Sequence, residues 1–296
     1  MTPDPIKNAS GARARRTAVT GGLVAALLGV TAAAHAQQRP LHTQDPEGVG
    51  AGRLLVEVGV EIGTDVTFPA SGLVGDLIRA PVVGVAIGLG SIVDLQIQAS
   101  LRERLAIAEL FDAPLSGMLD VAGDSTSGAG SVVVATKVRV VPETASRPAL
   151  GVRFATRLPT TSNENGLGLD TTDFSVALLG AKRVGGLRVA ANLGLGILGD
   201  PTRGDRQNDV LEYGLSLARR VTDALALVGE VNGRVHTARA DPPPGTETAG
   251  QARAGIRWRA AGGVFDAAVL AGLTPRDGRL GITAGYTRVF DAFRVP

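Results

Sequence analysis

The sequence predicts an all-β fold: a transmembrane antiparallel β-barrel of about 12 strands, of the outer-membrane type. Three observations predict it. Apolar and polar residues alternate with period two along nearly the whole chain after residue 52. The connections between the alternating segments are mostly short and long in turn. The longest later apolar run, 80–89, is interrupted by Pro81 and falls short of the ~20 residues that a membrane-spanning helix needs.

Composition excludes several classes of protein. The 296 residues include no Cys, so the chain has no disulfide framework, thiolate metal site or Cys nucleophile. A hydrophobic content of 44% argues against disorder. Four of the 30 basic residues and one of the 28 acidic ones precede residue 37, which leaves 26 and 27 in the remainder. A nearly neutral chain lacks the basic footprint of a nucleic-acid-binding protein, and we expect no nucleic-acid partner.

Residues 1–36 have the pattern of a secretory signal peptide. Arg13, Arg15 and Arg16 precede an apolar stretch rich in Ala and Gly, and Ala34-His35-Ala36 fits an A-x-A cleavage site. The alternative is an amino-terminal membrane anchor, but no stop-transfer pattern follows the stretch. We expect export, cleavage after Ala36 and a periplasmic leader over 37–52.

Twelve segments carry the alternation. In the first, Val56, Val58 and Val60 share one face while Glu57 and Glu61 take the other. The twelve expected strands are 53–62, 79–89, 92–104, 131–141, 148–158, 172–183, 187–198, 209–220, 224–236, 250–259, 264–273 and 280–290. They define a barrel domain over 53–290, followed by a tail over 291–296.

A soluble β-sandwich also alternates, with its apolar side chains turned inward. Connection lengths favour the barrel. Links after even-numbered strands are short, such as Gly90-Ser91, whereas most links after odd-numbered strands are longer, such as 63–78 and 105–130. Short periplasmic turns and long outer loops are typical of outer-membrane barrels. All seven aromatic residues within strands fall on the apolar face, and Trp258, Phe265 and Phe290 lie at the short-turn ends.

Several short motifs resemble those of the "MetA-pathway of phenol degradation" outer-membrane proteins. Residues 128–137, which read GAGSVVVATK, are similar to the family's GxGD element and its following strand. Leu158-Pro159-Thr160 resembles the family's PTG, and Asn192-Leu193-Gly194 its later N-x-G strand. Ser131 departs from the family's Asp and Thr161 from its Gly. The resemblance implies an outer-membrane barrel that passes small compounds, often aromatic or apolar.

A twelve-stranded barrel lies between a filled eight-stranded barrel and an open sixteen-stranded pore. The polar faces of the strands supply charges that should line its lumen. The lumen-lining candidates are Lys137, Arg139, Arg153, Arg157, Glu57, Glu61, Asp94, Glu212, Glu230, Arg234, Arg253 and Arg257. One interpretation is that these charges pair across a wet lumen; the other is that the Arg and Lys side chains attract anionic solutes.

Segment 105–130 is unusually apolar for a loop, with Leu105, Ile107, Leu110, Phe111 and Leu115. We expect it to fold into the barrel as a constriction. The alternatives are an extension of the flanking strands above the membrane and a short helix.

The sequence therefore predicts a passive channel or facilitator for small solutes, aromatic or anionic. The alternatives are a closed structural or partner-binding barrel and an outer-membrane lipid hydrolase, in which His236 would meet Glu230 or Ser216. We expect no enzymatic activity, catalytic residue, metal or cofactor. The expected partners are outer-membrane lipid, a small-molecule solute and, during biogenesis, the barrel-assembly machinery.

Overall fold

The computed structural model describes residues 38–294 and is built almost entirely of antiparallel strands. The expected signal peptide over 1–36 lies outside the described residues, as do the last two residues of the expected tail. The elements are β1 (Arg53–Phe68), β2 (Leu73–Gly88), β3 (Val93–Ser100), β4 (Glu103–Leu110), the 3-10 turn η1 (Ser116–Met118), β5 (Ser125–Gly128), β6 (Val132–Val141), β7 (Ala149–Leu158), β8 (Asp173–Val184), β9 (Leu187–Gly199), β10 (Gln207–Arg220), β11 (Leu225–His236), β12 (Ala249–Ala260), β13 (Gly263–Gly272) and β14 (Leu280–Asp291). No helix within residues 38–294 is long and apolar enough to cross a membrane.

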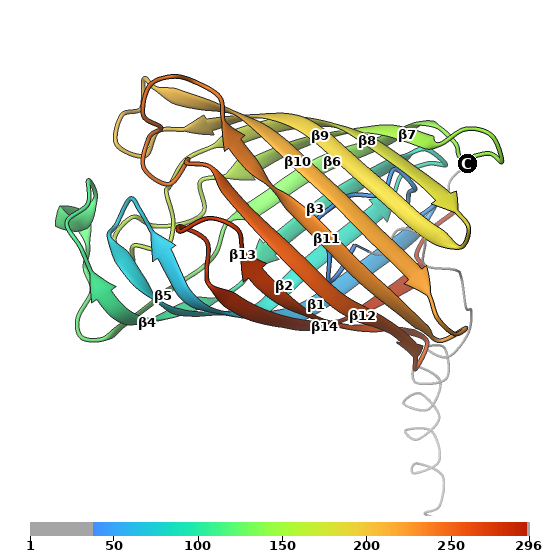
Figure 1. Cartoon of the computed structure of the whole chain (residues 1–296), viewed down its shortest axis with the longest axis horizontal. Coiled ribbons are helices and arrows are strands. Elements are labelled where there is room, and N and C mark those ends of the chain that lie inside the picture. Colours follow the sequence, from blue (N-terminus) through green and yellow to red (C-terminus); the bar gives the residue numbers. More distant parts are fainter. Residues whose placement is uncertain (1–37, 295–296) are drawn as a thin grey trace, which may run out of the picture.

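Twelve of the strands close into a barrel (Figure 1). The ring runs through β1, β2, β3 and β6 to β14, each strand pairing with the next. It closes where β14 pairs with β1, from Arg53 opposite Asp291 to Thr64 opposite Leu280. Closure satisfies the edge hydrogen bonds of the sheet, which the interior of a bilayer cannot do. The predicted twelve-stranded antiparallel barrel is confirmed.

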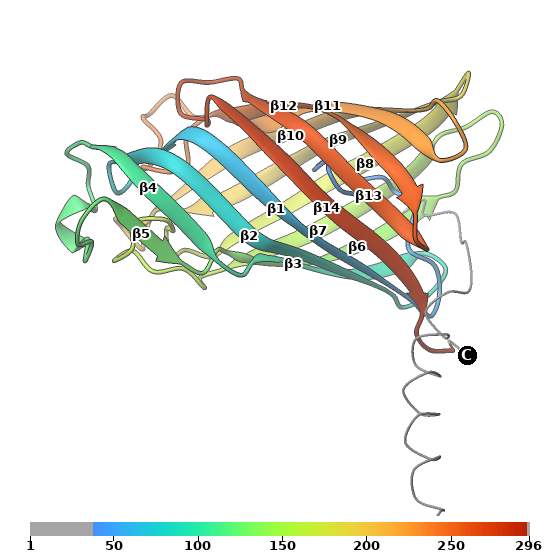
Figure 2. The same cartoon turned by 90° about the horizontal axis from the view of Figure 1, so that it is seen from below.

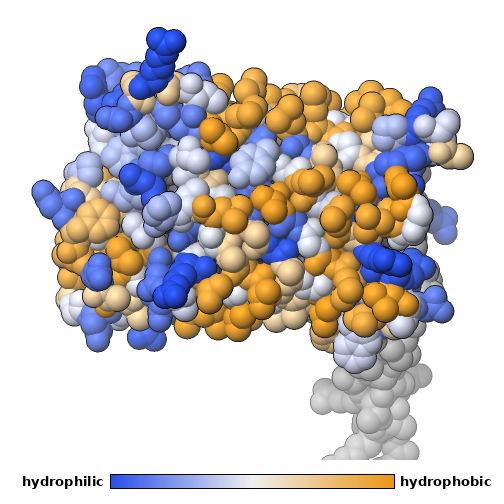
Figure 3. Space-filling view, in the orientation of Figure 1, coloured by the Kyte–Doolittle hydropathy of each residue, from blue (hydrophilic) through white to orange (hydrophobic). Residues whose placement is uncertain are grey.

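The barrel turns its apolar side chains outward. Leu178, Leu193 and Leu195 are 64%, 55% and 61% exposed, whereas the charged side chains of Asp94 and Lys137 are buried at 1% and 3%. Hydrophobic residues accordingly cover much of the outer wall (Figure 3). This distribution is the reverse of that in a soluble sandwich and suits a wall in contact with acyl chains.

At the long-loop end the sheet extends further than the sequence suggested. β1 continues to Phe68 and β2 begins at Leu73, so most of the expected loop 63–78 is a hairpin. This extension of the strands is stabilised by an inward-packing cluster of Leu73, Leu77, Leu105 and Leu167. These four leucines are buried by contact with one another and continue the strands beyond the ring.

Segment 105–130 is not a constriction within the lumen, so that expectation is wrong. β4 pairs with the outer half of β2, from Leu73 opposite Leu110 to Arg79 opposite Glu103, and β5 pairs with β4. Both strands project at the end of the molecule opposite the carboxyl terminus (Figures 1 and 2). The alternative of an extended sheet is correct, with η1 as its only helical turn among the described residues.

The short-turn end carries the expected aromatic residues. Trp258 and Phe265 lie on paired positions of β12 and β13, with ring centroids 6.0 Å apart. The Phe265 ring lies 4.8 Å from that of Tyr286 on β14. Trp258 and Phe265 are 53% and 41% exposed. An outward aromatic group at this depth suits the interface between acyl chains and headgroups.

Candidate functional site

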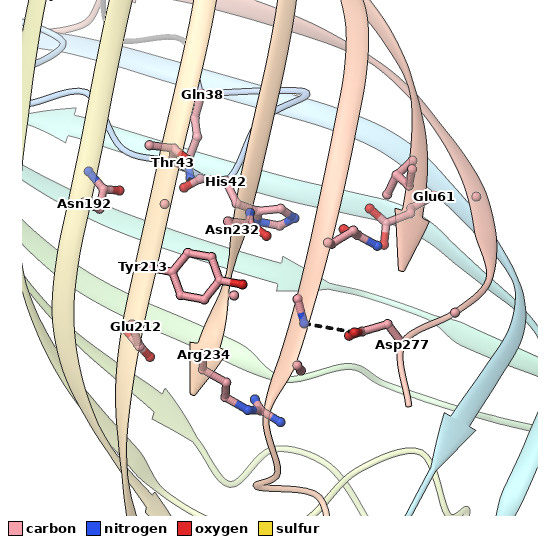
Figure 4. A pocket seen from close by; sticks show the side chains of 18 of the residues that line it. Gln38, His42, Thr43, Glu61, Asn192, Glu212, Tyr213, Asn232, Arg234 and Asp277 are labelled. Atoms are coloured by element: carbon pink, nitrogen blue, oxygen red, sulfur yellow. Dashed lines mark hydrogen bonds between the residues drawn. The ribbon is translucent and has the colours of Figure 1, made fainter. Parts of the chain in front are cut away.

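The segment before the first strand lies inside the barrel and fills part of its lumen. We call residues 38–50 the plug. Leu41, Thr43, Gln44 and Val49 of the plug are buried, at 5–6% exposure. Gln38, His42 and Thr43 are seen within the ring of strands in Figure 4. The structure thus differs from the expected periplasmic leader, because an extended segment in the lumen gains hydrogen-bond partners from the wall.

Carboxylates of the wall accept the N–H groups of the plug. Glu230 on β11 accepts the backbone N–H of His42 at 2.7 Å and that of Thr43 at 2.8 Å. Glu57 on β1 accepts those of Gln38 and Arg39, at 3.1 and 3.2 Å. Charge-assisted bonds of this kind are stronger than neutral ones. They hold the plug at two distant points of the wall.

Asp94 on β3 provides a third point of attachment. It accepts the N–H of Val49 at 3.1 Å and lies 3.5 Å from the ammonium of Lys137. Lys137 in turn donates to the carbonyls of Asp45 and Glu47 at 3.0 and 2.7 Å. These contacts fix the end of the plug that leads into β1.

Cations of β12 donate to plug carbonyls. Arg257 donates to the carbonyls of Gln38 and Arg39, at 2.7 and 2.8 Å. Arg253 donates to that of Pro40 at 3.0 Å. Side chains of the wall therefore hydrogen-bond to both the N–H groups and the carbonyl groups of the plug backbone.

The charged side chains of the plug pair with the wall as well. Arg39 lies 3.5 Å from Asp266. Asp45 lies 2.7 Å from Arg188, and Glu47 pairs with Arg139. Removing one partner of a buried pair leaves a desolvated charge, which is costly.

The remaining candidate residues pair among themselves or with loops. Glu61 lies 2.8 Å from Arg79 and 3.2 Å from Arg253. Arg157 pairs with Asp173, and Arg153 donates to the amide oxygen of Gln96 at 3.0 Å.

Two candidates face the long-loop end of the lumen. Arg234 donates to the carbonyls of Glu247 and Gly245, both at 2.9 Å. Glu212 lines the same region as Arg153 and Arg234. Most of the Arg and Lys side chains that could attract an anion therefore have an acidic or carbonyl partner.

The plug separates cavities at the two ends of the lumen. A cavity of about 570 Å³ opens toward the long loops, where Arg276 and Asp277 line it, and a second of about 460 Å³ lies beside β3 and β6. A smaller cavity of about 170 Å³ lies at the short-turn end, near Thr222 and Asp223. Thr43 lines both the largest and the smallest of the three. The plug is thus the partition between the two ends.

Two of the motifs that resemble a known family lie together in space. Val132 donates its N–H to the hydroxyl of Thr160 at 3.0 Å, which joins the GAGS segment to the Pro-Thr segment. Thr161 accepts the N–H of Asp170 at 3.2 Å. A Cβ on Gly168 would lie 2.0 Å from that of Thr161, so only glycine fits there. These two motifs therefore meet at one loop junction, whereas Asn192 of the third motif lies within β9 and donates to the carbonyl of Gln44 in the plug, at 2.8 Å.

His236 is not placed for catalysis with Glu230 or Ser216. Its two ring nitrogens lie 2.7 Å from the side-chain oxygen of Asn208 and 2.7 Å from the carbonyl of Ala240. Ser216 and Glu230 face each other across β10 and β11, whereas His236 lies opposite Val210 at the end of β11. The lipid-hydrolase alternative required His236 to contact Glu230 or Ser216, and this geometry does not bring them together.

Comparison with known proteins shows to which family this barrel belongs. The family model described as "Putative MetA-pathway of phenol degradation" matches residues 37–288. The chain belongs to this family. The resemblance inferred from the GAGS, Pro-Thr and Asn-Leu-Gly motifs is confirmed.

One solved structure shares the barrel fold of this MetA-pathway family member. The COG4313 outer membrane channel from Pseudomonas putida F1 has 16% sequence identity and a TM-score of 0.59, with 83% of this chain and 98% of that chain covered. The Ralstonia pickettii toluene transporter TbuX has 11% identity and a TM-score of 0.46, with 83% and 92% covered. No curated protein matches the chain. The family and the fold together establish an outer-membrane β-barrel.

Proposed function

We propose that this barrel is a passive channel or facilitator for small solutes and that solutes pass when the plug moves. The observation that carries the proposal is the plug itself: it separates a wide polar cavity on the long-loop side from a small cavity on the short-turn side. Its attachments are mainly hydrogen bonds and ion pairs, with one apolar contact where Val49 packs against Leu55 and Ala86. Such contacts can be exchanged for water when the plug leaves.

The family description supports small aromatic compounds as the solutes. The polar lumen favours those that can form hydrogen bonds, because apolar compounds would leave its polar groups without partners. We further propose that the barrel-assembly machinery inserts the protein into the outer membrane. We propose no enzymatic activity, since both ring nitrogens of His236 already have partners.

A reversible lock on the plug tests the channel. A Cβ added at Gly214 would lie 3.5 Å from the Cβ of Thr43, within the range that a disulfide spans. Thr43→Cys with Gly214→Cys should therefore tie the plug to β10, in a chain with no other cysteine. We expect the oxidised protein to conduct little in planar bilayers and to exclude phenol from liposomes, and a reductant to restore both.

The two single variants serve as the matched controls. Thr43→Cys and Gly214→Cys each introduce one cysteine into a chain that has no other, so neither can form an internal disulfide. Each should show the same conductance under oxidising and reducing conditions. Equal conductance of the oxidised and reduced plug variants, with the bond verified by mass spectrometry, would show that the plug does not gate. An absence of conductance in every form would favour a closed structural barrel.

A further inference from the structure

His42 lies in the plug, and its side chain points into the long-loop cavities. Its backbone N–H contacts both carboxylate oxygens of Glu230, at 2.7 and 2.9 Å, which fixes its position. The side chain is exposed and lines both long-loop cavities. Within residues 38–294 the structure records no hydrogen bond to its ring. Figure 4 shows the ring between Asn232 and Glu61, inside the larger cavity.

The surroundings of this ring are rich in neutral hydrogen-bonding groups. Amides of Gln38, Asn192, Asn232 and Gln251 line the cavity. The hydroxyl of Thr43 is buried and has no hydrogen-bond partner. The Thr43 hydroxyl is out of reach of a solute, and the amides already have partners within the protein: Gln38 donates to the carbonyl of His42 and Asn192 to that of Gln44. The ring of His42 has hydrogen-bonding capacity that a solute with a hydroxyl group could satisfy, whereas a hydrocarbon of equal size could not.

Charged groups in the cavity are mostly engaged with one another. Glu61 pairs with Arg79, and Arg276 lies 2.7 Å from Glu247. The carboxylate of Asp277 accepts the N–H of Gly250 at 2.9 Å, as drawn in Figure 4. An ion entering the cavity would compete with these contacts, so the lining favours a neutral solute. The volume of about 570 Å³ lies within the usual range for small-molecule sites.

We propose that the larger cavity binds neutral, hydroxyl-bearing small molecules and that the imidazole of His42 is a hydrogen-bonding contact for them. This inference rests on the proposed channel function and specifies its solute class. Leu179 and Leu270 face the same cavity and are buried at 2% and 3% exposure. They provide a small apolar surface beside the polar groups. An amphipathic molecule such as phenol matches both.

The scarcity of histidine makes a direct test possible. The chain has three His residues, and His35 precedes the expected cleavage site, so the mature protein should contain His42 and His236 alone. In detergent-solubilised protein labelled with carbon-13 at the His ring, phenol should shift the His42 resonance in a saturable manner. Toluene, which has a methyl group in place of the hydroxyl, should bind about tenfold more weakly, as expected for the loss of one hydrogen bond.

His236 provides the internal control, because its ring is held by Asn208 and Ala240 away from the plug. His42→Phe keeps an aromatic ring but removes both nitrogens, so its phenol affinity, measured by equilibrium dialysis, should fall about tenfold to that for toluene. His236→Phe should bind phenol as the unchanged protein does. Equal affinities for phenol and toluene, a phenol shift shared by both histidines, or no shift at His42 would each overturn the proposal.

The channel and the binding site can fail separately. Saturable binding at His42 without phenol entry into liposomes would reject the channel and retain the site. Phenol entry without a response at His42 would retain the channel and reject the site.

Discussion

Glu230 is the residue on which the seating of the plug most depends. It accepts two plug N–H groups and lies 3.6 Å from Arg253, and its side chain is fully buried. Glu230→Ala would leave these donors and the guanidinium without their partner, which costs about 3 kcal/mol in comparable buried pairs. We expect the plug to leave the lumen far more often, seen in single-channel recordings as a higher open probability.

Glu212 provides the control for Glu230→Ala. It is also a lumen carboxylate, on the neighbouring strand β10, but no plug residue bonds to it among residues 38–294. Glu212→Ala should leave the open probability close to that of the unchanged protein. If both substitutions open the channel equally, the effect is due to lost negative charge in the lumen and not to the plug contacts.

Residue by residue, the sequence predicted which side chains face inward but not what they contact. Alternation places Glu230 and Arg253 on the polar faces of their strands, since the side-chain period of a strand is two. The partners of Glu230 lie 187 and 188 residues away in a segment without periodicity. No local pattern encodes such a contact. The only available signal is the large number of inward charges, which implies that something polar must satisfy them.

Among the elements, β8 and β9 test the orientation of the wall. Leu193 lies in the middle of β9 and faces outward, and Val184 at the end of β8 does too, at 61% exposure. Leu193→Arg should lower the free energy of unfolding by about 2–4 kcal/mol, because arginine at the bilayer midplane is costly. Val184→Arg should cost about 0–1 kcal/mol near the interface. Denaturant unfolding in lipid vesicles measures both, and equal costs would contradict the membrane depth assigned to these strands.

The turn between β6 and β7 offers a test that depends on pH. Slight burial works to raise the pKa of Glu143, but the N–H of Arg183 at 2.8 Å and the guanidinium of Arg188 outweigh it and hold the pKa below its usual value. A lowered carboxylate pKa contributes stability that is present above the usual pKa and is lost as the pH falls through the folded value.

We therefore expect amide hydrogen exchange in residues 142–148 to accelerate relative to the strands as the solution is acidified into that range. Glu143→Gln should remove this pH dependence. An unchanged dependence in the variant would assign it to another group.

The sequence predicted the membrane-spanning strands but not the strands beyond the membrane. The membrane-spanning parts follow the alternation closely because the lipid face imposes it on every strand. The extension formed by β4 and β5 obeys a different rule, since Leu105 is buried against Leu73 and Leu167, not against lipid. Burial there depends on three segments distant in sequence. Its apolar residues were visible in the sequence, but their packing partners were not.

For the whole molecule, the charge balance of the lumen yields a prediction about ion selectivity. The plug carries Arg39, Asp45 and Glu47, a net charge of −1 when His42 is neutral. Deleting residues 38–50 should leave the closed ring of strands intact, since its hydrogen bonds run between neighbouring strands. The wall would then lose acidic partners for Arg139 and Arg188. The open lumen should therefore gain positive potential.

We expect the plug-deleted channel to conduct more and to prefer chloride over potassium, because uncompensated charge in a pore sets its selectivity. The reversal potential across a KCl gradient measures this preference. Adding Arg139→Glu to the deletion should reduce it, since Arg139 loses its partner Glu47 with the plug. Arg53→Glu is the control: Arg53 pairs with Asp291 at the start of the barrel and contacts no plug side-chain charge among the described residues. A cation preference in the deleted channel would contradict the assignment of the plug as the counter-charge of the lumen wall.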